Sequence, residues 1–302
     1  MREAVKKMSD FVRQRRRRLQ IWAIAVLAIT AGLGAQSLWP QLRILQGDGQ
    51  ALPVWTVLFV FGAALFCEYM DSSLGMGYGT ILTPVLLLAG FAPLQIVPCV
   101  LLSEFITGLS AAVLHHHDGN VDLLRDREVR STAILLLLLS GVGASAAVFL
   151  AVSISKAVLT VIISIIILAA GIITLATTNR QLRYRRSHII VIGAVAAFNK
   201  GLSGGGYGPL VTSGQVVSGL SPKKAVGITS LAESLTCIIG LTAYLLAGKS
   251  VNWALAVPLT AGAILSVPMA TLTVKCLSEK VMRACVGLTT CALGIYALLK
   301  LL

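Results

Sequence analysis

The sequence predicts an all-α polytopic membrane protein built as an inverted-topology repeat. Each half is expected to be a glycine-broken re-entrant hairpin plus three transmembrane helices, with one extra N-terminal helix. Of the 302 residues, 56% are hydrophobic and only 12% are charged, about half the charged fraction of a soluble domain. Long apolar segments follow one another, and two glycine-rich stretches repeat in register. These observations exclude a soluble enzyme and a nucleic-acid module, and the lack of strand-like alternation excludes a transmembrane β-barrel.

The first element is a basic N-terminus followed by an apolar segment. Eight of the 25 Lys and Arg residues precede residue 19, and the apolar run 19–39 follows them. A signal peptide has the same order of regions, but this run approaches the ~20 residues that span a bilayer. We therefore expect residues 1–50 to form a cytoplasmic N-terminus and a retained first transmembrane helix.

Ten more apolar segments follow, and two of them are too short to cross a membrane. Segments 79–90 and 208–219 would each form about 18 Å of helix at 1.5 Å per residue, against a hydrocarbon core of about 30 Å. Each comes directly after a glycine-rich stretch. The segments are 53–71, 79–90, 93–114, 131–151, 156–178, 188–200, 208–219, 222–246, 252–274 and 281–301.

The glycine-rich stretches belong to an internal repeat. At an offset of 129 residues, Gly75-Met-Gly-Tyr-Gly79 aligns with Gly204-Gly-Gly-Tyr-Gly208, and residues 75–107 give 11 identities in 33 positions without a gap. The rare residue types Glu, Pro and Tyr are among the identities. We expect repeat 1 over residues 51–178, a basic cytoplasmic linker over residues 179–187 and repeat 2 over residues 188–302.

The distribution of basic residues favours an inverted repeat in the cytoplasmic (inner) membrane. If both glycine-rich elements are re-entrant hairpins, 20 of the 25 Lys and Arg residues fall inside and four fall outside, as the positive-inside rule requires. The N-terminus is then cytoplasmic and the C-terminus lies outside. A continuous broken helix would instead give a parallel repeat and place the basic linker 179–187 outside.

The glycine breaks predict a binding site for an anion. A helix that restarts near Gly79 or Gly208 points unpaired N–H groups and its positive dipole end at mid-depth, as in transporters with repeated halves. The alternative is that the glycines only allow tight helix packing. The substrate-binding residues expected are Gly75, Gly77, Tyr78, Gly79, Asn199, Ser203, Gly204, Gly205, Gly206, Tyr207 and Lys200.

Lys200 is the one basic residue expected near the middle of the membrane, about 18 Å along a helix that begins at His188. A lysine at this depth is costly and usually functional. Its repeat counterpart is Asp71, so related positions carry opposite charges. One interpretation is a structural ion pair. The other is that Lys200 neutralises an anionic substrate while Asp71 releases the substrate or carries a proton.

Two glutamates at matching positions are candidates for proton coupling. Glu104 and Glu233 each lie eleven residues after a helix-opening proline, about 16 Å deep. A buried carboxylate can exchange protons, so both are expected to couple transport to protons, together with Asp71. The competing interpretation is that each glutamate accepts hydrogen bonds from the N–H groups of a broken helix. Glu68, one turn before Asp71, is expected to face the same cavity.

Neutral hydrogen-bond donors suited to an oxyanion surround the breaks, namely Ser72, Ser73, Tyr78, Thr80, Asn199, Ser203, Tyr207, Thr212, Ser213 and Gln215. The run His115-His-His117 before Asp118 contains common zinc ligands, but adjacent residues of a helix point in different directions. We therefore expect this run to cap a helix at the membrane interface and expect no metal site. The six cysteines show no CxxC spacing and are expected to be buried small side chains.

These residues resemble a known family. The segments Gly75-Met-Gly-Tyr-Gly-Thr-Ile-Leu-Thr-Pro84 and Gly204-Gly-Gly-Tyr-Gly-Pro-Leu-Val-Thr-Ser213, together with His115–Asp122, resemble those of the sulfite exporter TauE/SafE family. The resemblance covers roughly residues 53–301. Met76 stands where the paired motif has a glycine, which makes the two half-sites unequal.

The resemblance implies secondary transport, without a cofactor, of a small sulfur-containing anion such as sulfite, sulfoacetate or another organosulfonate. The residues themselves predict an anion site, proton coupling and alternating access around the two breaks. An anion channel, a transporter of a different small oxyanion or carboxylate, and an intramembrane enzyme remain as alternatives. The expected partners are the small anion, the lipid bilayer and, as an option that the sequence leaves open, a second copy of the chain.

Overall fold

The computed structural model describes residues 46–47, 50–91, 93–150, 168, 172, 175–176, 186–203, 207–246 and 248–299. The predicted helix 19–39 lies outside this part of the chain, as does nearly all of 156–178. Residues 204–206, at the centre of the second glycine-rich stretch, lie outside it as well.

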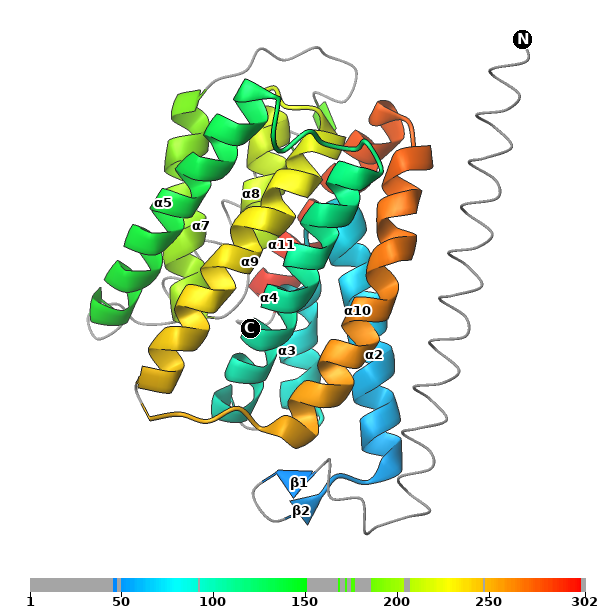
Figure 1. Cartoon of the computed structure of the whole chain (residues 1–302), viewed down its shortest axis with the longest axis vertical. Coiled ribbons are helices and arrows are strands. Elements are labelled where there is room, and N and C mark those ends of the chain that lie inside the picture. Colours follow the sequence, from blue (N-terminus) through cyan, green and yellow to red (C-terminus); the bar gives the residue numbers. More distant parts are fainter. Residues whose placement is uncertain are drawn as a thin grey trace.

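Most of the described residues are helical, as predicted (Figure 1). A two-residue antiparallel ribbon of β1 (Gln46–Gly47) and β2 (Gln50–Ala51) precedes the helices. The helices are α2 (Val54–Leu74), α3 (Tyr78–Leu88), α4 (Pro93–His117), α5 (Arg127–Leu150), α7 (Arg186–Ser203), α8 (Tyr207–Val217), α9 (Pro222–Leu246), α10 (Trp253–Cys276) and α11 (Glu279–Leu299).

Helix lengths separate membrane-spanning candidates from shorter elements. Within the described residues, stretches of α2, α4, α9 and α10 are long and apolar enough to cross a membrane. Helices α3 and α8 have only 11 residues each, or about 16 Å at 1.5 Å per residue. The prediction of two short helices after the glycine-rich stretches is therefore confirmed.

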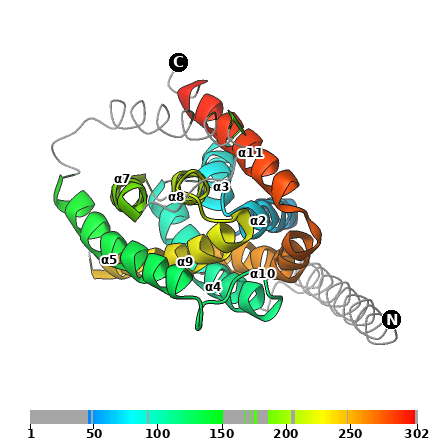
Figure 2. The same cartoon turned by 90° about the horizontal axis from the view of Figure 1, so that it is seen from above.

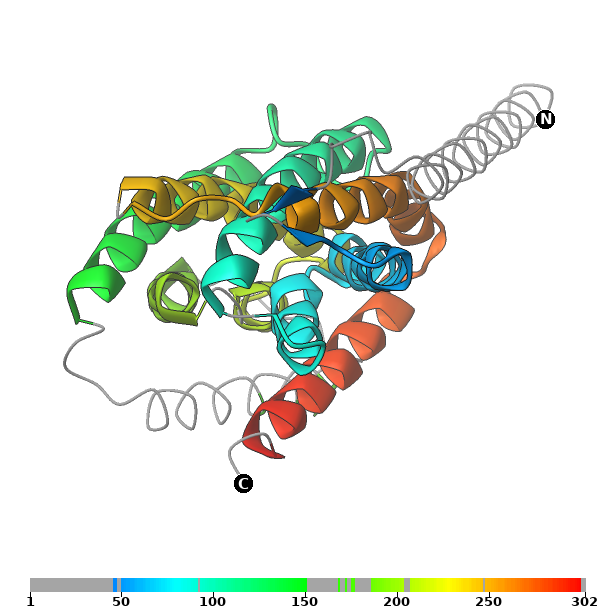
Figure 3. The same cartoon turned by 90° about the horizontal axis from the view of Figure 1, so that it is seen from below.

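The helices form two layers, which are clearest along the long axis of the molecule (Figures 2 and 3). One layer contains α5, α9, α4 and α10, and the other contains α7, α8, α3 and α2. Helix α11 packs outside the second layer, where it contacts α8, α9 and α2. The site described below lies between the layers.

The third long helix of each predicted half packs on the other half. Helix α5 packs against α7 and α9, and α10 packs in the same way against α2 and α4. The central helices α4 and α9 also contact each other and run in opposite directions in Figure 1. Each half is therefore tied to the other through equivalent contacts.

The connections α4–α5, α8–α9 and α10–α11 lie at one end of the molecule, here called the basic end (Figure 1). The β ribbon and the α9–α10 connection, which includes Lys249, lie at the opposite end. The basic residues within and beside the basic-end connections are Arg125, Arg127, Arg130, Lys223, Lys224, Lys275, Lys280 and Arg283.

Asp126 begins α5 and ties it to α9 at the basic end. Its Oδ1 accepts hydrogen bonds from the N–H groups of Glu128 (3.0 Å) and Val129 (3.3 Å), the usual role of a helix N-cap aspartate. Its Oδ2 accepts a hydrogen bond from Lys224 Nζ at 2.6 Å. This bond from the Lys224 ammonium, reinforced by the N-cap bonds, lowers the pKa of the Asp126 carboxyl.

Candidate functional site

The first break, between α2 and α3, is built from glycines with positive φ. Gly75 has φ of 71° and ends α2, donating its N–H to Asp71 O at 2.6 Å, and Gly77 has φ of 134°. L-residues with side chains rarely adopt such conformations. Helix α3 then starts at Tyr78, so the N–H groups of its first turn face the interior of the protein.

Two carboxylates receive N–H groups of this first turn. Gly79 N–H donates to Glu104 Oε1 at 3.0 Å, and Tyr78 N–H lies 3.4 Å from Asp71 Oδ1. Negative groups are stabilised at a helix N-terminus by its unpaired N–H groups and its dipole. Of the two interpretations of Glu104, hydrogen bonding to the broken helix is therefore observed.

The second break contacts the first. A Cβ on Gly208, near the start of α8, would lie 2.6 Å from Gly75 O and 2.8 Å from Met76 Cα, so only glycine fits there. The Thr212 hydroxyl donates to Gly75 O at 2.7 Å. The predicted approach of the two glycine-rich elements is thus observed for Gly208 and Thr212, which follow residues 204–206.

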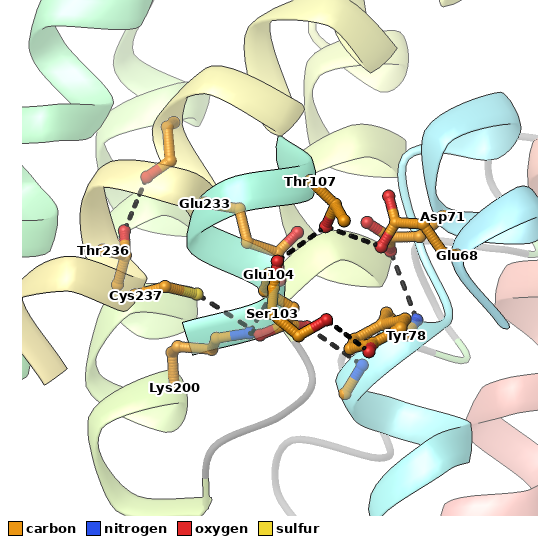
Figure 4. Close-up of polar contacts among 12 residues, drawn as sticks. Glu68, Asp71, Tyr78, Ser103, Glu104, Thr107, Lys200, Glu233, Thr236 and Cys237 are labelled. Atoms are coloured by element: carbon orange, nitrogen blue, oxygen red, sulfur yellow. Dashed lines mark hydrogen bonds and ion pairs between the residues drawn. The ribbon is translucent and has the colours of Figure 1, made fainter. Parts of the chain in front are cut away.

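Beside the breaks lies a buried cluster of three charged residues, Glu104, Lys200 and Glu233, here called the charge cluster (Figure 4). Lys200 Nζ donates to Glu104 Oε2 at 2.5 Å and to Glu233 Oε1 at 2.9 Å. Their exposed fractions are only 3%, 3% and 6%, in the order Glu104, Lys200, Glu233. Cys237 adds a thiol hydrogen bond to Glu104 Oε2 at 3.3 Å.

The ion pair of Lys200 differs from the pair suggested by the repeat. Within the described residues, Lys200 pairs with the two glutamates rather than with its repeat counterpart Asp71. The physical reason is that Asp71 lies at the end of α2 and faces the start of α3, whereas the glutamates reach the centre from α4 and α9. The sequence identified all four residues but not this pairing.

The two glutamates are not equivalent. Glu104 has bonding partners for both oxygens, the Gly79 N–H at Oε1 and Lys200 at Oε2. Glu233 Oε2 is buried and has no hydrogen-bond partner among the described residues. This oxygen is the most direct place in the charge cluster to add a proton.

Glu68 lies in the same polar region (Figure 4). It is buried, and its two oxygens accept hydrogen bonds from Ser72 Oγ (2.6 Å) and Thr107 Oγ1 (3.0 Å). The repeat alignment pairs Thr107 with Thr236 as an identity. That identity is the signal in the sequence that could mark Thr107 as a site residue.

The two repeat tyrosines are fully buried, and each hydroxyl bonds to a serine. Tyr78 OH lies 2.7 Å from Ser103 Oγ and Tyr207 OH lies 3.2 Å from Ser140 Oγ. Their hydroxyls therefore have protein partners in this structure. Of the other predicted binding residues, the backbones of Asn199 and Ser203 lie in the last two turns of α7, while Gly204, Gly205 and Gly206 lie outside the described residues.

The expectation that the histidine run caps a helix at the interface is wrong for His115, which is fully buried. Asn120 Nδ2 donates to His115 Nδ1 at 3.0 Å, so Nε2 carries the proton and donates to Ser72 O at 2.8 Å. Only His117 is exposed. No group of three potential ligand side chains among the described residues is arranged to hold a metal.

Comparisons with known proteins agree with these features. The model of the family described as "Sulfite exporter TauE/SafE" matches residues 60–297. The chain is 30% identical over 244 residues to the "Probable membrane transporter protein YtnM" of Bacillus subtilis (strain 168), an alignment that covers 76% of this chain and 78% of the relative. No solved structure matches the chain.

Proposed function

Because the chain belongs to the sulfite exporter TauE/SafE family of membrane transporters, we propose that it is a secondary transporter for a small sulfur-containing anion. Sulfite, sulfoacetate and other organosulfonates are the substrates considered. Transport is coupled to protons and proceeds by alternating access around the two glycine breaks.

The observation that carries this proposal is Lys200 between Glu104 and Glu233, beside the start of α3. Burying three charges is expensive and often contributes nothing to net stability, and intramembrane ionisable residues usually serve transport. The Lys200 ammonium and the Gly79 N–H of α3 both donate hydrogen bonds to the Glu104 carboxylate in this structure. A small anion could accept the same hydrogen bonds. We infer that the anion displaces a carboxylate from Lys200.

Proton coupling follows from the charge balance of the charge cluster. With both glutamates ionised, one lysine faces two carboxylates, and Asp71 lies nearby. Binding of an anionic substrate would add a further negative charge and is therefore unfavourable unless one of the carboxylates takes up a proton. Glu233, whose Oε2 has no hydrogen-bond partner among the described residues, is the proposed proton acceptor.

The inverted repeat, with halves 51–178 and 188–302, is proposed as the basis of alternating access. The opposite directions of α4 and α9 and the equivalent packing of α5 and α10 support it. Rocking one half against the other around the shared breaks would open the site to either side. The basic end is proposed to be cytoplasmic, in line with the positive-inside rule.

The test is uptake of radiolabelled sulfoacetate and sulfite into proteoliposomes. We expect saturable uptake by the natural protein and none by Lys200→Ala. Lys249→Ala, in the exposed α9–α10 connection at the end opposite the basic end, is the control. Because Lys200→Ala leaves two buried carboxylates without a cation, the double variant Lys200→Ala/Glu233→Gln is tested beside it. The proposal would be overturned if a folded Lys200 variant bound the substrate as tightly as the natural protein does, or if uptake by the natural protein did not saturate.

A further inference from the structure

The two halves differ in polarity on either side of the charge cluster. One helical turn before each glutamate, α4 carries Val100 and α9 carries Thr229, which are matching positions at the 129-residue offset. On the short helices the corresponding pair is Leu86 on α3 and Gln215 on α8. Half 2 is therefore polar where half 1 is apolar.

The polar side is linked by hydrogen bonds to the first break. Gln215 Nε2 donates to Thr229 Oγ1 at 2.8 Å, the hydroxyls of Thr229 and Thr212 are 2.9 Å apart, and Thr212 donates to Gly75 O at 2.7 Å. These residues lie between the charge cluster and the basic end, since α8 ends and α9 begins at that end (Figure 1).

Polar atoms remain without partners on this side. Gln215 Oε1 and Ser218 Oγ have no hydrogen-bond partner among the described residues, although these residues are only 1% and 0% exposed. Burying such atoms is unfavourable unless water or a solute completes their bonding. They indicate that the α8–α9 side is built to be wet during transport.

On the opposite side, Thr83 Oγ1 and Asn252 Oδ1 are also buried without a partner among the described residues, but the layer next to the charge cluster is apolar. Leu86 and Val100 belong to a closely packed core with Leu82, Ile96 and Leu255, and their exposed fractions are 0% and 1%. Close-packed aliphatic side chains exclude water. This layer separates the charge cluster from the end of the molecule that holds the β ribbon.

We propose that Gln215 and Thr229 line the route by which the anion moves between Lys200 and the basic end, and that Leu86 and Val100 form the closed gate on the opposite side. The amide and hydroxyl groups are neutral hydrogen-bond donors to an oxyanion, so they would bind it less tightly than the charged Lys200 does. The identity of the solute rests on the proposed function, whereas the assignment of a polar and an apolar side does not.

The first test needs no substrate turnover. In a chain whose six cysteines are replaced by serine or alanine, Gln215→Cys and Leu86→Cys are labelled with the small sulfonate reagent 2-sulfonatoethyl methanethiosulfonate. Two further chains mark the two sides of the membrane: one keeps Cys276, exposed near the basic end, as its single cysteine, and the other carries Lys249→Cys, at the opposite end, as its single cysteine.

We expect Gln215→Cys to react from the basic end about tenfold or more faster than Leu86→Cys reacts from either side, because a thiolate forms readily where water reaches it. Sulfoacetate should slow the labelling of Gln215→Cys. Equal rates at the two positions, or faster labelling of Leu86→Cys, would overturn the inference.

The second test uses transport by variants that copy the other half. Gln215→Leu and Thr229→Val should each raise the KM for the anion roughly fivefold to tenfold, the effect of losing one neutral hydrogen bond. Gly62→Ala is the control, since a Cβ there meets no atom within 4 Å. Unchanged KM in both variants, with flux still dependent on Lys200, would overturn the inference and leave the proposed function standing. Lack of saturable flux in the natural protein would defeat the proposed function, while the labelling contrast would still decide the polarity of the two sides.

Discussion

At the scale of single residues, the centre of this protein contains an arrangement that is poorly suited to stability alone. Removing one partner from a buried ion pair typically costs 3–5 kcal/mol, whereas replacing the whole set with apolar residues is often neutral. The chain nevertheless retains Glu104, Lys200 and Glu233 with exposed fractions of 3%, 3% and 6%. Under the proposed function, a transported anion and a proton would give these three charges a role that packing alone does not.

His115 is buried and both of its ring nitrogens have hydrogen-bond partners, so its substitution provides a residue-scale prediction of stability. His115→Ala removes the acceptor for Asn120 Nδ2 and the donor to Ser72 O, and we expect it to reduce the free energy of unfolding by about 1–3 kcal/mol. Thermal unfolding in detergent measures the effect. His117→Ala, at an exposed position of the same run, is the control, and equal melting temperatures for the two variants would contradict the prediction.

At the scale of elements, the sequence predicted which segments are helices better than where they begin. The predicted segment 222–246 coincides with α9, but α5 begins at Arg127 rather than at residue 131. The apolar run omits Arg127, Glu128 and Arg130, whereas the true start is set by Asp126, whose carboxylate caps the helix. A capping residue lies outside the hydrophobic pattern and is missed when that pattern alone is read.

The pairing of Lys200 illustrates a different limit. Depth along a helix can be counted from the sequence, and that count placed Lys200, Glu104 and Glu233 near mid-membrane. Which of them are in contact depends on the packing of α4, α7 and α9, for which sequence spacing gives no rule. Repeat symmetry suggested Asp71 instead, because symmetry relates positions that need not be in contact.

The contact between the two breaks gives the element-scale prediction. A methyl group on Gly208 would lie 2.6 Å from Gly75 O, so Gly208→Ala must push α8 away from the first break. We expect a loss of about 1–3 kcal/mol, typical of overpacking, and loss of anion uptake measured in proteoliposomes.

Gly62→Ala is the matched control, since a Cβ there meets no atom within 4 Å and the residue lies within α2. Alanine is the better helix former by up to about 1 kcal/mol, so this variant should be at least as stable as the natural protein. Normal uptake by Gly208→Ala would show that the close approach of the breaks is not needed for transport.

At the scale of the whole molecule, the crossed packing of the halves explains how a small site could control a large motion. Helix α5 of the first half holds α7 and α9, and α10 of the second half holds α2 and α4. Each break is therefore framed by helices from both halves. The ion pairs of the charge cluster join α4, α7 and α9, so under the proposed function a change in these pairs would act on all three helices at once, as alternating access requires.

The proposed proton coupling gives a prediction at the scale of the whole transport cycle. If one proton enters with each anion, lowering the pH should strengthen apparent anion affinity by up to about tenfold per pH unit, because binding takes up that proton. Glu233→Gln is permanently neutral and should bind the anion with little dependence on pH. Its uptake should also no longer respond to an imposed pH gradient.

Binding measured by calorimetry across a pH series, with Asp122→Asn in the exposed α4–α5 loop as the control, separates these outcomes. If Glu233→Gln keeps the full pH dependence, the proton acceptor is Glu104, Asp71 or Glu68 instead. If binding by the natural protein does not depend on pH, the proposal of proton coupling is wrong.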